Sequence, residues 1–114
     1  MSTITAFQPM GKTFVLVGNS TNQTVTVSAD SPVSQYLFVS HEPAATGQPV
    51  YVRISPTAGN AAAVPNAASG NYGIPIRPAT SLVLTGPNST GNVYISFLTA
   101  TGTANVYVTP GEGL

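Results

Sequence analysis

Residues 92–109 read NVYISFLTATGTANVYVT and carry the clearest indication of the fold class. Two runs in which apolar and polar residues largely alternate, 92–98 and 105–109, flank a Thr-Gly-Thr turn. A period of two is typical of β-strands, because successive side chains point to opposite faces of a sheet. The stretch therefore predicts two strands, each with valine on the core face and a tyrosine, Tyr94 or Tyr107, on the other face.

The same period recurs upstream and predicts about eight short strands in one domain. Ten prolines and eleven glycines are spread between the runs and are typical of turns. Short strands separated by turn signals indicate an all-β protein: a single antiparallel β-sandwich or jelly roll, without significant helix. The predicted strands are 13–17, 24–28, 35–39, 50–54, 72–76, 81–85, 92–98 and 105–109.

Two of these runs also predict where the strand lies in its sheet. Residues 35–39 are apolar on both faces, which favours a central position. Pro75 lacks the N–H that a central strand would donate, so the run around it is expected at a sheet edge. In the run 50–54, the pattern turns three β-branched residues inward and Tyr51 and Arg53 outward.

The remaining segments predict the organisation of the domain. We expect an extended N-terminal arm over residues 1–12, the sandwich over 13–109 and a flexible tail over 110–114. A long loop rich in Ala, Pro and Gly, residues 56–71, interrupts the sandwich; loops of this length are often functional or disordered. Two interpretations stay open for it, an arm that reaches a neighbouring subunit and a mobile surface loop. Residues 86–91, GPNSTG, predict a turn.

Charge is the most unusual feature of the composition. Only six of the 114 residues are charged, and the charges cancel. An ordinary soluble domain is about a quarter charged. An uncharged surface is easier to bury against another protein, because few ions must lose their water. This composition indicates a component of an assembly. The six residues are Lys12, Asp30, Glu42, Arg53, Arg77 and Glu112.

The same counts limit the other function classes. The balanced charge offers no electrostatic attraction to nucleic acid or to an anionic membrane. The chain contains no cysteine, so neither disulfides nor thiolate metal sites are expected. We also expect no secretory signal at the N-terminus and no membrane span.

Residues capable of catalysis are scarce. His41 is the single histidine, and Glu42 is the only acid near it in the sequence. Together they could form a base and its orienting partner, but a solvated turn between two strands accounts for both. We therefore expect no enzyme activity, no cofactor and no bound metal.

The tyrosines and arginines supply the candidate binding residues. Because Tyr51, Tyr94 and Tyr107 alternate with valines that face the core, their rings are expected on outward faces. Outward tyrosines are enriched in protein interfaces, and Arg53 and Arg77 are rare charges suited to a contact across such an interface. Stacking of sugar rings on the tyrosines is the competing interpretation.

The chain as a whole resembles a known class of protein. The features are the Ser- and Thr-rich strands over 13–109, the arm 1–11, the Gly-rich tail 110–114 and a polar surface almost without charge. In these it is similar to small virion structural proteins of tailed bacteriophages, especially capsid decoration or cement proteins. The likeness is one of overall character, and no diagnostic motif carries it.

The resemblance implies a location in the virion, after assembly in the host cytoplasm. It implies binding to the outer capsid lattice, with two partners: further copies of the chain, as dimers or trimers, and the major capsid protein. It supplies no catalytic residue. Other positions in the particle stay open, as head–tail connector or as a tail- or fibre-associated piece. A carbohydrate-binding or adhesion module is the alternative from another class.

Overall fold

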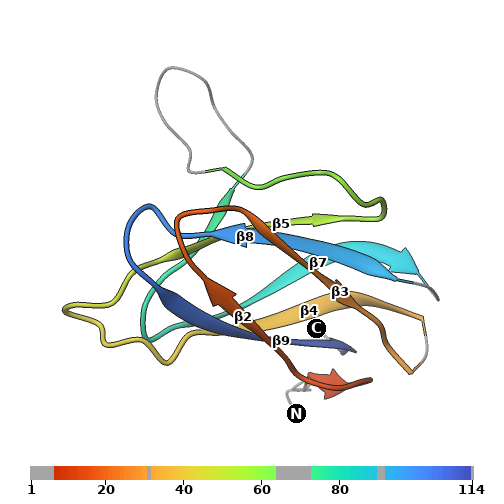
Figure 1. Cartoon of the computed structure of the whole chain (residues 1–114). Helices are drawn as coiled ribbons and strands as arrows, with labels where there is room; N and C mark the ends of the chain where they lie inside the picture. The colour runs from red at the N-terminus through yellow and green to blue at the C-terminus, as the bar shows by residue number, and fades with distance from the viewer. Residues whose placement is uncertain (1–6, 31, 64–72, 90–91, 114) are drawn as a thin grey trace, which may run out of the picture.

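The computed structural model describes residues 7–30, 32–63, 73–89 and 92–113, and this part of the chain folds into β-strands without helix (Figure 1). The strands lie in two antiparallel sheets, as the alternation of apolar residues predicted. Their bounds are β1 Gln8–Pro9, β2 Phe14–Gly18, β3 Gln23–Val27, β4 Val33–Val39, β5 Val50–Ser55, β6 Ile74–Ile76, β7 Ser81–Ser89, β8 Val93–Leu98 and β9 Ala104–Glu112.

The strand order is that of a jelly roll. Sheet A runs β7-β4-β9, with β2 and β1 both along the far edge of β9, and sheet B runs β3-β8-β5-β6. The pairs β2–β9, β3–β8, β4–β7 and β5–β6 form one long antiparallel ribbon. Pairing of β9 with β4 and of β8 with β5 closes the wound ribbon into two sheets. The eight-stranded jelly roll is built in this way.

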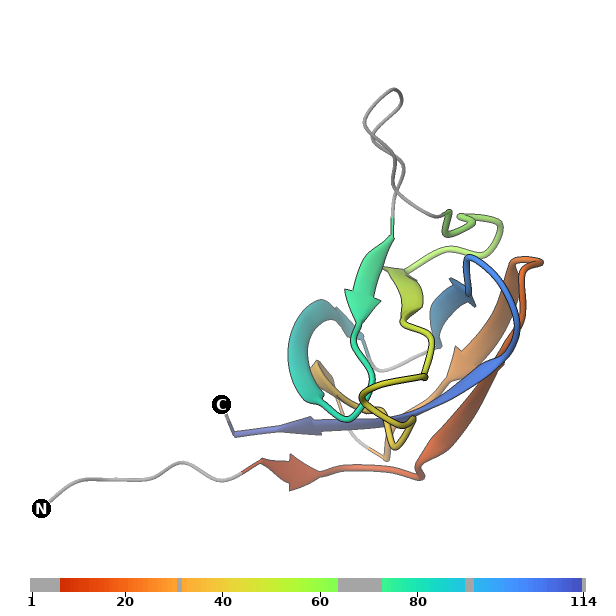
Figure 2. The same ribbon diagram turned by 90° about the vertical axis from the view of Figure 1, so that its left-hand side faces the viewer.

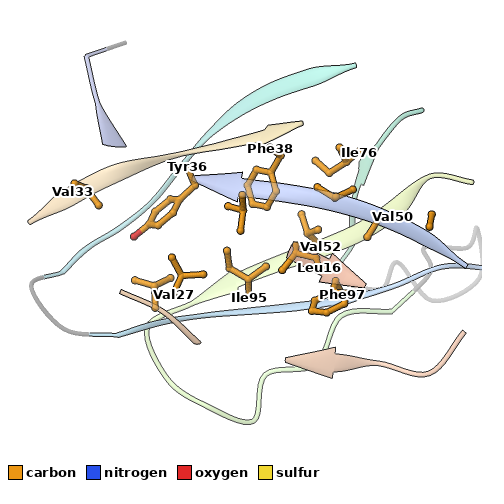
Figure 3. Close-up of a cluster of buried hydrophobic side chains, with 14 residues drawn as sticks. Leu16, Val27, Val33, Tyr36, Phe38, Val50, Val52, Ile76, Ile95 and Phe97 are labelled. Carbon is orange, nitrogen blue, oxygen red and sulfur yellow. The ribbon is translucent and has the colours of Figure 1, made fainter. Parts of the chain in front are cut away.

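The core lies between the two sheets and is formed by the inward positions of the alternating runs (Figure 3). Tyr36 and Phe38 of sheet A and Phe97 of sheet B are its largest side chains, each at most 1% exposed. Burial of apolar surface at about 25 cal/mol per Å² is the main term that holds two such sheets together. The remaining fully buried core residues are Leu16, Val27, Val33, Val50, Val52, Ile76, Val93, Ile95, Val106 and Val108.

Two predicted strand positions are found in the sheets. β4, which is apolar on both faces, lies between β9 and β7 and is therefore central. β6 contains Pro75 and lies at the edge of sheet B, where its missing N–H breaks no ladder.

β7 is longer than the sequence predicted. Gly86 and Pro87, expected to form a turn, belong to this strand. Between Thr85 and Ser89, four steps along β7 correspond to two along β4, from Gln35 to Val33, so the strand bulges here. An edge strand tolerates this sequence because it needs no outward N–H from Pro87.

β9 is also longer than predicted, and residues near both ends of the described chain belong to sheet A. The sequence placed residues 110–114 in a flexible tail, but Pro110 and Gly111 are buried and β9 ends at Glu112. Gln8 and Pro9, which lie in the predicted extended arm, pair with Glu112 and Gly111 as β1. The two ends of the described chain therefore stabilise each other at the edge of sheet A.

Candidate protein interface

The outer face of sheet A, called here the sheet A face, carries no charged side chain in the described residues. Strand register assigns to this face the side chains that alternate with the core positions. They are valine, leucine, tyrosine and uncharged polar residues. The members are Val15 and Val17 of β2; Asn105, Tyr107 and Thr109 of β9; Gln35, Leu37 and Val39 of β4; and Ser81, Val83 and Thr85 of β7.

Apolar side chains form a continuous row across this face. Val15 lies opposite Tyr107, and Tyr107 lies opposite Val39 on its other side. Two residues along β4 from Val39, Leu37 lies opposite Val83 of β7. Val15 is 45% exposed, and the other four are half-buried. The row joins four strands, β2, β9, β4 and β7, so it forms a patch instead of isolated exposed residues.

A hollow lies beside this patch, where the chain leaves β4. It has a volume of about 390 Å³ and is lined by residues after β4 and before β7, among them His41, Ala79 and Thr80. The His41 ring packs edge-on against Tyr107, with ring centroids 5.5 Å apart. The hollow therefore adjoins the Tyr107 part of the apolar row.

The outer face of sheet B differs because the chain covers part of it. After β5 the described loop, residues 56–63, turns back over the side of sheet B that faces away from sheet A (Figure 2). The Ser96 hydroxyl on β8 donates to the carbonyl of Asn60 (2.8 Å), and the Asn60 side-chain amide donates to Ser55 Oγ (2.6 Å). Ser55 and Ser96 are buried as a result.

The same loop is held at its far end. Arg53 Nη1 donates to the carbonyl of Ala61 (3.2 Å), and the Ala62 N–H donates to Asn22 Oδ1 (2.9 Å). Ala62 is only 4% exposed. In its described part, the loop expected to reach a neighbour or to move freely is thus attached to its own sheet, while residues 64–71 lie outside the described residues.

The structure separates the five candidate interface residues. Tyr107 lies on the sheet A face, whereas Tyr51, Tyr94 and Arg53 lie on the outer face of sheet B. Tyr51 is opposite Leu98, four residues along β8 from Tyr94. Arg77 follows β6 and is exposed. The three tyrosines are half-buried and do not form one stacking platform.

Sequence reasoning missed most of the sheet A face. Val15, Val17 and Leu37 belong to runs that are apolar on both faces, and such runs usually indicate a strand covered on both sides. That double-sided apolar pattern was the available signal. Here Val15 and Val17 are exposed on the second side of β2. On β4, Leu37 and Val39 are half-buried and Gln35 is buried, and the His41 ring packs against Tyr107 at the margin of the face.

The two residues considered for catalysis, His41 and Glu42, both lie in the described part of the chain. His41 contacts Tyr107, and the Glu42 N–H donates to Ser40 Oγ, so both belong to the connection after β4. In the described ranges, no three His, Cys, Asp or Glu side chains gather closely enough to hold a metal ion. Nor does this part of the chain contain a helix long and apolar enough to cross a membrane.

No family model, curated protein or solved structure matches this chain. The comparisons therefore transfer no residue role or ligand to it. The contrast between its two sheet faces is the observation from which a function can be inferred.

Proposed function

We propose that this protein is a structural subunit that binds other proteins through the sheet A face. The observation that carries the proposal is the uncharged, apolar row of Val15, Tyr107 and Val39 on a face that the described chain leaves open. The outer face of sheet B, by contrast, is partly covered by residues 56–63.

Such a face suits a permanent contact. Burial of apolar surface contributes about 25 cal/mol per Å², and no charged side chain on this face has to lose its water. The contact should also depend weakly on salt, because screening acts on charges. Where many copies bind a repeating lattice together, a modest contact for each copy gives a strong total effect.

The specific role we propose is that of a capsid decoration or cement protein on a tailed phage. Its support is the overall resemblance in composition together with this open face. In this role the sheet A face contacts the major capsid protein on the outside of the head, and the protein acts without chemistry or cofactor. A head–tail connector or a tail-associated piece would use the same surface in another part of the virion.

Binding to particles tests the proposal. The purified protein is mixed with virions of the same source that lack it, and the bound fraction is measured after sedimentation. We expect Tyr107→Ala and Val83→Lys each to weaken binding about tenfold, which corresponds to about 1.4 kcal/mol.

Tyr94→Ala is the matched control, because Tyr94 is also a half-buried strand tyrosine but lies on the outer face of sheet B. It should bind like the unaltered protein. Equal binding by all variants would contradict a role for the sheet A face. Failure of the unaltered protein to bind any virion fraction would contradict the virion role, and loss of binding only with Tyr94→Ala would favour the sugar-stacking alternative.

A further inference from the structure

The two sheets have open edges, and most of them carry features that oppose pairing with another strand. In sheet B, β6 is three residues long and contains Pro75, while β3 presents the polar side chains Gln23, Thr24 and Thr26. In sheet A, β7 bulges at Gly86 and Pro87. Short strands, prolines, polar side chains and bulges are the usual means by which a sheet edge avoids pairing.

β2 lacks these features. Its sequence, Phe-Val-Leu-Val-Gly, contains no charge and no proline, and its register with β9 is unbroken over all five residues. Val15 and Val17 are 45% and 56% exposed, the latter the highest value among the large hydrophobic residues described as exposed. In the described part of the chain no strand pairs with the other side of β2.

We propose that β2 pairs with β2 of a second copy, antiparallel and about a two-fold axis at Leu16. The pairing would join two A sheets into one continuous sheet. In this register Val15 of each copy lies opposite Val17 of the partner, so four valines form one cluster on the extended sheet A face. A self-paired strand meets its own side chains, so the absence of charge from β2 removes like-charge repulsion.

The size of this contact sets its expected strength. A standard stable interface buries about 800 Å² on each partner, and a pair of five-residue strands buries less. We therefore expect a dimer that exchanges with monomer in solution at micromolar concentrations. Inside an assembly, where a second contact holds neighbouring copies together, the same pairing would be fully formed.

Cysteine crosslinking tests the register, because the chain contains no cysteine of its own. Val15→Cys and Val17→Cys proteins are prepared separately, mixed in equal amounts and oxidised. Residues directly opposite in an antiparallel pair have Cα atoms about 4.5–5.5 Å apart, which fits a disulfide. We expect the mixed dimer to exceed the two homodimers combined. A mixed dimer no more abundant than the two homodimers combined would overturn the proposal, as would crosslinking no greater than in denaturant.

Sedimentation velocity across a range of concentrations tests the pairing itself. Val17→Lys should raise the dissociation constant of the dimer at least about tenfold, because a lysine would lie opposite Val15 at each of the two places where the paired strands bring valines together. Thr26→Lys on β3 is the matched control, an exposed edge residue changed to the same side chain, and should dimerise normally. A Val17→Lys protein as dimeric as the unaltered one would overturn the proposal.

This inference concerns self-association and does not require the virion role. Binding of Tyr107→Ala to particles reports on the proposed function, whereas the mixed disulfide forms in solution without particles. The two proposals can therefore fail separately.

Discussion

At the scale of single residues, Ala79 has an unfavourable backbone conformation. Its φ of 57° is the only positive value at a non-glycine residue in the described ranges. With Pro78 before it, Ala79 holds the third position of a turn closed by Thr80, whose hydroxyl donates to the Arg77 carbonyl (2.6 Å). This is the arrangement of a type II turn, where glycine is preferred.

We expect Ala79→Gly to stabilise the protein. Alanine in the left-handed region costs about 1–2 kcal/mol, and glycine avoids this cost. The greater freedom of glycine in the unfolded chain offsets about 0.4–1 kcal/mol of the resulting stabilisation. The free energy of unfolding, measured in denaturant, should rise by about 0.5–1 kcal/mol. Ala45→Gly, an exposed turn residue with negative φ, should lower it instead. A lower value for Ala79→Gly would contradict this reading of the turn.

Tyr36 should make the free energy of unfolding depend on pH in the alkaline range. Its hydroxyl donates to the Pro87 carbonyl (3.2 Å), and burial, with a smaller effect of the Glu112 carboxylate, raises the pKa of Tyr36 above its ordinary value of 10.0. The folded protein then retains a proton that the unfolded chain loses. Stability from this group is complete below pH 10 and is lost as the pH rises through the folded pKa.

The free energy of unfolding, measured from neutral pH to well above pH 10, should show this loss. Tyr36→Phe removes the hydroxyl and should flatten that part of the pH profile. Tyr94→Phe keeps Tyr36 and should retain the loss. An identical alkaline slope in the Tyr36→Phe protein would show that other groups cause it.

At the scale of the element, β9 depends on its last residues. The Met10 N–H donates to the Pro110 carbonyl (2.9 Å), and the Ser34 N–H donates to Glu112 Oε1 (2.8 Å). Removal of residues 110–114 eliminates both bonds and the pairing of β1 with β9. At about 1 kcal/mol for each hydrogen bond, this deletion should lower the free energy of unfolding by at least about 2 kcal/mol.

Deletion of residues 113–114 alone is the control, since β9 ends at Glu112. It should change stability little. Equal stability of the two shortened proteins would mean that residues 110–112 act as the flexible tail that the sequence suggested. Denaturant unfolding followed by circular dichroism measures both.

At the scale of the whole molecule, the jelly roll explains why the two faces differ. The ribbon is wound so that its first and last strands, β2 and β9, lie together in sheet A. The described part of the loop at the closed end of the ribbon, residues 56–63 after β5, folds back over the outer face of sheet B. Within the described residues, the topology thus covers part of this face, and no strand or loop segment of this kind lies over the sheet A face. The proposed binding face and the proposed dimer edge are both in sheet A.

The fold class and most of the core residues can be predicted from local patterns in the amino-acid sequence. Alternation of valine with threonine or tyrosine selects strands, because each run can bury only one of its faces. Pro75 correctly indicated an edge strand, because the missing N–H of proline is known from the residue type alone and excludes a central position. The same local reasoning misjudged Gly86 and Pro87 as a turn and Pro110 as tail, since each is tolerated only through its neighbours in the sheet.

Which residues share a surface depends on how the strands are ordered in the folded molecule. Tyr51, Tyr94 and Tyr107 have the same local pattern, yet Tyr107 is separated from the others by the thickness of the sandwich. Val15 and Val17 belong to a run that is apolar on both faces, and such a run usually has a neighbour on each face. Whether that neighbour exists depends on strand order and on where the loop folds, and these follow from contacts between residues far apart in the chain.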